Sequence, residues 1–317
     1  MRLGIALVPE FIGRAKTVAC GVSAEEVGYD SVWVPEHLNG GEAFSLLGAI
    51  AAKTSKIRLG TAVVSINLRH PAVTALAAAT LNDVSGGRFT LGLGLGDLTQ
   101  LRSSLGIVND KPVRSMVEAV KICRQIFGGS SHFEGERFRS HLHHIMRPTS
   151  SPKIFMAAVG EQMLRAAARY GDGVIFSIFL SPESVKKSTA VIKTARGLSA
   201  RRDDFEFMGL LATASEKHIQ QLKELAAVFL SWPGRAKQSL PIYLFNKVDV
   251  EKLSLLVSRG ETGKAAELVD DEVLEELACI GSLKTIRRKI GEFVDAGVTY
   301  PVLYPVGDAK RFLKKLV

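Results

Sequence analysis

The chain has 317 residues, of which 46% are hydrophobic and 23% are charged. This ordinary globular composition excludes a chain that is wholly disordered, collagen-like or coiled-coil. Lys and Arg outnumber Asp and Glu by 41 to 32, for a net charge of +9, but the basic residues are dispersed and form no nucleic-acid-binding motif, so we expect no nucleic-acid partner and favour an anionic cofactor or substrate.

Short apolar runs alternate with helical patterns from one end of the chain to the other. The eight runs that we predict as strands cover residues 3–8, 31–34, 57–65, 88–92, 154–158, 173–177, 205–213 and 299–304. The predicted helices cover residues 13–27, 44–53, 71–84, 112–127, 161–170 and 182–196, a long helical region over 215–294, and a last helix over 309–316. We expect breaks in the long region at Trp232-Pro233-Gly234 and at Gly260, and residues 130–151 look irregular, with room for a short hairpin.

Eight strands separated by helices predict parallel pairing through crossover connections. The strands are unbroken apolar runs, as expected where both faces of a sheet are buried. A doubly wound open sheet would alternate in the same way. We favour an α/β fold of the (β/α)8 TIM-barrel type with insertions, formed by residues 1–317 as a single domain, because the strand count reaches eight and no linker divides the chain.

Polar residues and glycines follow the predicted strands at the ends where such a barrel carries its chemistry. In chain order they are Glu36, His37, Arg69, Gly94, Gly96, Asp97, Gly160 and Ser177. Each also has a plainer interpretation. Glu36 and Asp97 could be helix caps or solvated loop residues, His37 a structural histidine, and Arg69 the partner of a nearby acid.

Three further patterns bear on ligands. The glycines of residues 92–97 alternate and lack the spacing of a dinucleotide-binding loop, and we expect no helix to begin directly after them. Gly160 opens a predicted helix, where backbone amides and the helix dipole favour an anion. His141, His143 and His144 form the only histidine cluster in the sequence. The cluster could be a metal site or part of a polar loop at the mouth of a pocket; we favour the loop and predict no metal.

The cysteines and the N-terminus indicate a compartment. Cys20, Cys123 and Cys279 are isolated in the sequence, which argues against a disulfide framework or a zinc site and fits a reducing cytoplasm. The first apolar run is too short for a signal peptide or a membrane span. We therefore expect a cytoplasmic protein with no membrane partner.

Several motifs resemble the signature of the luciferase-like oxidoreductases, the family of bacterial luciferase, alkanesulfonate monooxygenase and the enzymes that use the deazaflavin coenzyme F420. The motifs are DSVWVPEH at 30–37, LGTAVV at 59–64, RHP at 69–71, TLNDVSGGR at 80–88, LGLG at 91–94 and ARYGDGVI at 168–175. The resemblance covers nearly the whole chain and implies a luciferase-like barrel.

Within that family, the chain is most similar to the branch of 5,10-methylenetetrahydromethanopterin reductase, through residues 263–272, residues 295–299 and Asp97. Enzymes of that branch move a hydride between the reduced deazaflavin and a folate-like C1 carrier of archaea. Their first strand carries a catalytic glutamate where this chain has Ala6, and the nearest acid here is Glu10, which we expect beyond the strand end. This departure leaves the exact substrate open.

The resemblance implies an F420-dependent oxidoreductase in which the protein positions the cofactor and supplies proton donors. Asp97, Glu36 and His37 are then the candidate acid–base or ring-contacting groups, and the phosphate end of the cofactor would lie near Gly160 and Glu161. The cofactor-binding residues implied in this way are Ala62, Val63, Val64, Gly94, Gly96, Ala158, Val159, Gly160, Glu161 and Ser177. The family also implies a non-prolyl cis peptide bond between Ala62 and Val63, under the cofactor ring.

Two alternatives stay open within the same resemblance: an FMN-dependent monooxygenase, and a relative that binds flavin without turnover, which Ala6 keeps open. The expected partner is a small-molecule substrate, and the branch implies a tetrahydromethanopterin C1 carrier. Relatives commonly form homodimers or homotetramers, so we expect a homo-oligomer.

Overall fold

The structure, a computed structural model, describes residues 2–197, 204–307 and 309. In this part of the chain, eight parallel strands close into a barrel, because β12 pairs with both β10 and β1. In their order around the barrel they are β1 (Gly4–Ala6), β2 (Ser31–Val34), β3 (Arg58–Thr61), β5 (Phe89–Gly94), β8 (Lys153–Ala157), β9 (Gly173–Phe176), β10 (Glu206–Ala214) and β12 (Tyr300–Pro305). The prediction of a (β/α)8 barrel is confirmed, and the alternative of an open sheet is wrong.

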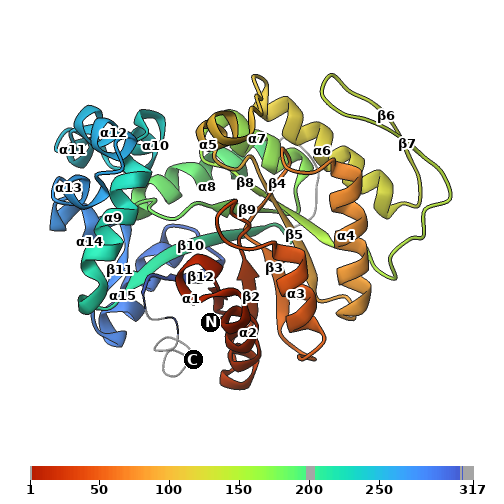
Figure 1. The fold of residues 1–317 in the computed structure, drawn as a ribbon, viewed down its shortest axis with the longest axis horizontal. Coiled ribbons are helices and arrows are strands. Elements are labelled where there is room, and N and C mark those ends of the chain that lie inside the picture. Colours follow the sequence, from red (N-terminus) through yellow and green to blue (C-terminus); the bar gives the residue numbers. More distant parts are fainter. Residues whose placement is uncertain (1, 198–203, 308, 310–317) are drawn as a thin grey trace.

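Helices surround the barrel (Figure 1). The connections as far as β10 contain α1 (Pro9–Ile12), α2 (Arg14–Val27), α3 (Ala43–Ala51), α4 (Pro71–Val84), α5 (Leu98–Leu105), α6 (Pro112–Phe127), α7 (Glu161–Tyr170) and α8 (Pro182–Gly197). A short antiparallel hairpin, β6 (Ser131–Glu134) with β7 (Arg139–Leu142), occupies the region that looked irregular. No helix in the described part of the chain is long and apolar enough to cross a membrane.

The long connection between β10 and β12 forms an additional helical layer beside the barrel (Figure 1). Its elements are η1 (Glu216–His218), α9 (Ile219–Leu230), α10 (Pro233–Ser239), α11 (Ile242–Phe245), α12 (Val250–Ser258), α13 (Thr262–Ala266), α14 (Asp271–Leu277), β11 (Cys279–Ile280) and α15 (Leu283–Asp295). The predicted breaks at residues 232–234 and at Gly260 are confirmed, since they separate α9 from α10 and α12 from α13. The predicted helix over 309–316 lies outside the described residues except for Ala309.

Two predicted elements need correction. The run over 57–65 is not one strand, because β3 ends at Thr61 and the short strand β4 (Val64–Ser65) follows it and pairs with β5. A helix, α5, does begin directly after Asp97, where we expected none. The Asp97 carboxylate accepts hydrogen bonds from the backbone N–H groups of Thr99 and Gln100, at 2.9 and 3.0 Å, which caps the helix.

Large side chains fill the interior of the barrel. Trp33 stacks on Phe155 with ring centroids 5.9 Å apart and meets Tyr300 edge-on at 6.1 Å. Gly60 makes this packing feasible, because a Cβ atom there would lie 2.2 Å from the Trp33 ring. The barrel is thus a packed core, and the loops at its rim must carry the ligand sites.

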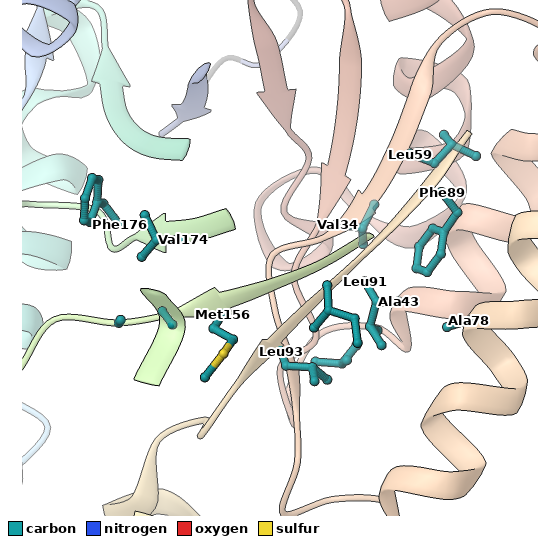
Figure 2. Close-up of a cluster of buried hydrophobic side chains, with 14 of the residues drawn as sticks. Val34, Ala43, Leu59, Ala78, Phe89, Leu91, Leu93, Met156, Val174 and Phe176 are labelled. Carbon is teal, nitrogen blue, oxygen red and sulfur yellow. The ribbon is translucent and has the colours of Figure 1, made fainter. Parts of the chain in front are cut away.

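A second core lies between the strands and the surrounding helices. Side chains alternate along each strand, so Leu91 and Leu93 of β5 point outward towards Ala43 of α3 and Ala78 of α4 (Figure 2). All four side chains are buried. This layer fixes the strands and thereby the loops that follow them.

Candidate active site at the C-terminal rim of the barrel

The peptide bond between Ala62 and Val63 is cis, as the resemblance implied. It lies between β3 and β4, where the Ala62 N–H donates to the Val34 carbonyl at 3.0 Å and the Val63 carbonyl accepts from the Glu36 N–H at 3.2 Å. The Val63 side chain lies against Gly94, where a Cβ atom would come within 2.2 Å of it. Ala62, Val63 and Gly94 therefore form one packed unit at the rim, next to the loop that carries Glu36.

Glu36 is held in an ion-pair network rather than left open to a ligand. Arg69 binds both of its carboxylate oxygens, at 2.7 and 2.5 Å, and also reaches Glu42 at 2.8 Å. The hydrogen bond that Arg69 donates to Glu36 is the main cause that raises the pKa of Arg69. The plainer interpretation of Arg69, as the partner of a nearby acid, is confirmed.

A cavity of about 450 Å³ opens beside this network. Its lining includes Arg14, Glu36, His37 and Arg69, so charged groups of both signs surround it. Glu42 also lines it and caps α3, because its carboxylate accepts from the backbone N–H groups of Phe44 and Ser45. The charges of this cavity are largely compensated within the protein.

His37 pairs with Glu10, a contact that sequence reasoning missed. Glu10 lies in α1, beyond the end of β1 as expected, and its carboxylate accepts a hydrogen bond from Nδ1 of His37. The Glu10 side chain is 15% exposed and that of His37 44%. Burial by itself raises the pKa of Glu10, but the hydrogen bond and the charges of His37 and Arg14 outweigh it, so this pKa lies below its ordinary value.

Asp97 lies at the end of β5, close to a cation from a distant part of the chain. Arg235 of α10 is half-buried, and its guanidinium stacks 3.9 Å from the centre of the Trp232 ring and 4.9 Å from that of Phe229. Burial lowers the pKa of Arg235 to about 10, although the negative charge of Asp97 acts in the opposite direction. In the sequence, residues 232–234 indicated only a helix break, so Arg235 gave no local signal.

Helix α7 begins directly after Gly160, as predicted. Gly160 occupies the capping position, and no side chain among the described residues caps this helix. Glu161 is the first residue of the helix, and its carboxylate accepts a hydrogen bond from the guanidinium of Arg165 at 2.7 Å. A Cβ atom at Gly160 would meet only Gln238 of α10, at 3.4 Å, so α10 borders the same opening.

The remaining predicted cofactor-binding residues lie in the same rim loops. Ala158 and Val159 lead from β8 to α7, and Ser177 directly follows β9; Ala158 is buried, whereas Val159 and Ser177 are half-buried. Val64 is buried in β4, and Gly96 turns the chain before Asp97 with a φ of +72°.

The histidine cluster does not come together as the spacing suggested. His141 bonds His132 at 2.9 Å and Glu134 at 2.6 Å across the exposed β6–β7 hairpin, and His143 lies beyond β7. Within residues 2–197, 204–307 and 309, no group of three or more His, Cys, Asp or Glu could hold a metal ion. All three cysteines are buried, and none of them forms a disulfide in this part of the chain.

The chain is similar to known proteins over nearly its whole length. The chain is 30% identical to the 5,10-methylenetetrahydromethanopterin reductase of Archaeoglobus fulgidus, over 98% of this chain and 96% of the relative. It is 29% identical to the F420-dependent glucose-6-phosphate dehydrogenase of Kineococcus radiotolerans, over 99% of this chain and 94% of that one.

Among solved structures, the coenzyme F420-dependent tetrahydromethanopterin reductase of Methanopyrus kandleri shares the fold. It superimposes with a TM-score of 0.86 at 24% identity, over 100% of this chain and 96% of that one. The family profile described as luciferase-like monooxygenase matches residues 1–300. The chain therefore belongs to the luciferase-like monooxygenase family.

Proposed function

We propose that this protein is an F420-dependent oxidoreductase that transfers a hydride between the deazaflavin and a small substrate, with residues 1–317 acting as one domain. The observation that carries the proposal is the 30% identity to a 5,10-methylenetetrahydromethanopterin reductase over nearly the full length of both chains. The reductase of Methanopyrus kandleri, whose name also specifies coenzyme F420, has the same fold.

The rim residues fit a cofactor that has an apolar ring and an anionic tail. The uncapped N-terminus of α7 at Gly160 leaves backbone N–H groups for a phosphate, and Glu161 does not compete there because it pairs with Arg165. Val63 and Val159 are half-buried apolar side chains, suited to contact a ring. Ala62, Val64, Gly94, Gly96, Ala158 and Ser177 complete the proposed cofactor site.

The bound deazaflavin would supply the hydride chemistry, and the chain's own residues would position it and handle protons. Glu10 holds the Nδ1–H of His37, which leaves Nε2 as the atom that exchanges a proton. We assign the second proton-handling role to Asp97. Glu36 is a positioning residue in this scheme, because Arg69 occupies both of its oxygens.

Binding and activity measurements test the proposal. We expect fluorescence titrations to give a lower Kd for F420 than for FMN, because the similarity runs to F420-dependent enzymes and the protein carries a charge of +9. Equal or tighter FMN binding would favour an FMN-dependent monooxygenase instead. Binding of F420 without hydride transfer to any tested substrate would favour the non-catalytic alternative, which Ala6 keeps open.

The substrate class that we propose first is a compound related to the tetrahydromethanopterin C1 carriers that the similar reductases name, because Ala6 in place of an acid disfavours methylenetetrahydromethanopterin itself. We also propose a homodimer or homotetramer, because α4 presents exposed apolar side chains at Val73, Leu76 and Val84. Light scattering after size exclusion measures the mass directly. Dissociation caused by Leu76→Glu would support this face as the contact, and a monomeric wild type would contradict the proposed assembly.

A further inference from the structure

We propose that Arg235 binds an oxyanion, a phosphate or carboxylate group, at the rim of the barrel. Whether that group belongs to the cofactor or to the substrate rests on the proposed function. The binding of an oxyanion as such rests on the position and surroundings of Arg235 alone.

Arg235 carries a charge that the described part of the protein does not pair. Among the described residues, its guanidinium has neither a hydrogen bond nor an ion pair, although it is half-buried. Asp97 acts on it electrostatically, but no hydrogen bond or ion pair joins these two described residues, and the Oδ1 of Asp97 accepts from the N–H groups of Thr99 and Gln100. A partly desolvated cation without a hydrogen-bonded anionic partner is costly, and a bound anion would offset that cost.

The side chain is also held in place before any ligand arrives. Its guanidinium lies over Trp232 at 3.9 Å and Phe229 at 4.9 Å, and Phe229 in turn packs on Phe179 at 5.4 Å. Because aromatic rings contact the face of the guanidinium, its N–H edge stays available to bind two oxygens of a carboxylate or phosphate group. Fewer rotamers are therefore lost when an anion binds.

Helix α10 itself is anchored at the rim. The carbonyl of Ser239, its last residue, accepts hydrogen bonds from the Ser181 N–H at 2.9 Å and the Ser184 hydroxyl at 3.1 Å. These two serines belong to the loop after β9 and the start of α8. On the same helix, Gln238 lies next to Gly160, while Arg235 lies near Asp97. Helix α10 therefore lies beside two strand-end loops of the site, the loop with Asp97 and the loop with Gly160.

The first experiment uses inorganic phosphate and citrate as probes and needs no cofactor. Trp232 stacks on Arg235, and the other tryptophan, Trp33, is buried inside the barrel, so tryptophan fluorescence reports occupancy near Arg235. We expect a saturable change in the wild type and a Kd about 10–100-fold higher in Arg235→Gln, from the loss of a charge-assisted hydrogen bond. The Kd of Arg235→Lys should lie between these two values, since lysine keeps the positive charge but lacks the paired N–H groups of the guanidinium.

The matched control is Lys237→Gln, which removes an exposed cation from the same helix and should bind phosphate as the wild type does. Melting curves of all variants check folding, and if Arg235→Gln does not fold, Arg235→Lys alone gives the comparison. Phosphate affinity that is unchanged in the Arg235 variants, or equally reduced by Lys237→Gln, would overturn the proposal. So would the absence of any saturable change in the wild type.

The second experiment identifies the source of the oxyanion. Titrations compare F420 with a deazaflavin that lacks the phosphate and carboxylate tail. If the cofactor supplies the oxyanion, Arg235→Gln weakens F420 binding at least 10-fold and leaves the tailless compound unaffected; if the substrate supplies it, F420 affinity is unchanged and KM rises while kcat is retained. Either result supports the proposal. A wild type that binds phosphate at Arg235 but not F420 would refute the proposed function and leave this site intact.

Discussion

Replacing Asp97 by asparagine separates the two roles that its carboxylate could have. In the structure, one oxygen of Asp97 caps α5 through the N–H groups of Thr99 and Gln100. Asparagine is as good a capping residue as aspartate, but it cannot exchange a proton as a carboxylate does. Asp97→Asn should therefore keep the helix and lose the chemistry, whereas Asp97→Ala should lose both.

The two effects differ in size. Loss of a helix cap costs about 1 kcal/mol, within a range of about 0.5–2 kcal/mol, which lowers the melting temperature of a chain of this size by roughly 2 °C. Loss of a general acid–base group reduces turnover about 10²–10⁴-fold, or about 3–5 kcal/mol in the barrier. We therefore expect Asp97→Asn to melt as the wild type does and turn over about 10²–10⁴-fold more slowly, with little change in cofactor affinity.

The assay follows deazaflavin absorbance during turnover with the best wild-type substrate, next to a thermal melt of each variant. Asp249 provides the matched control, because it caps α12 in the same way, with Oδ1 2.9 Å from the Lys252 N–H, and has no role in the proposed site. Asp249→Asn should leave turnover unchanged. Wild-type turnover in Asp97→Asn would refute the catalytic role and leave Asp97 as a helix cap only.

Three other predictions concern the first strand, its loop and the barrel interior. With Ala6 in place of an acid, activity towards methylenetetrahydromethanopterin should be low in a steady-state assay, and full activity would show that another carboxylate has taken over. The pKa of Glu10 lies below its ordinary value of 4.5, so its ionised form stabilises the fold above that pH, and this stabilisation is lost as the pH falls through the folded-state pKa. Melting temperatures of the wild type and Glu10→Gln should therefore differ at neutral pH and converge once the pH has fallen below the folded-state pKa of Glu10; a constant difference would contradict this. Gly92→Ala should lower the free energy of unfolding in urea by about 1–3 kcal/mol, because the new methyl group would lie 1.9 Å from the Thr61 carbonyl oxygen. The control is Gly48→Ala in α3, where the new methyl group has nothing within 4 Å and should cost nothing. Equal effects of the two substitutions would refute the argument.

Local patterns in the sequence were enough to predict the barrel and most of its elements. Strand and helix signals depend on neighbours a few residues apart, so unbroken apolar runs and their spacing identified all eight barrel strands. The opening of α7 at Gly160 was readable for the same reason. At Asp97 the two sequence interpretations disagreed: the possibility that Asp97 is a helix cap is confirmed by α5, whereas the expectation of no helix directly after the glycines of residues 92–97 is wrong.

The partners of the site residues, in contrast, were decided by the tertiary structure. Glu10 meets His37, Arg69 meets Glu36, and Arg235 comes close to Asp97, and each pair joins segments that are far apart in the chain. Closing the barrel brings the loops after all eight strands to one rim, but which side chains meet there depends on side-chain directions and loop paths, which no local pattern encodes. The sequence by itself therefore determined which residues directly follow the strands and reach the rim, because that depends on local patterns. The packing of the loops decided which of their charges are paired, and it brought Arg235, which had no local signal, close to Asp97.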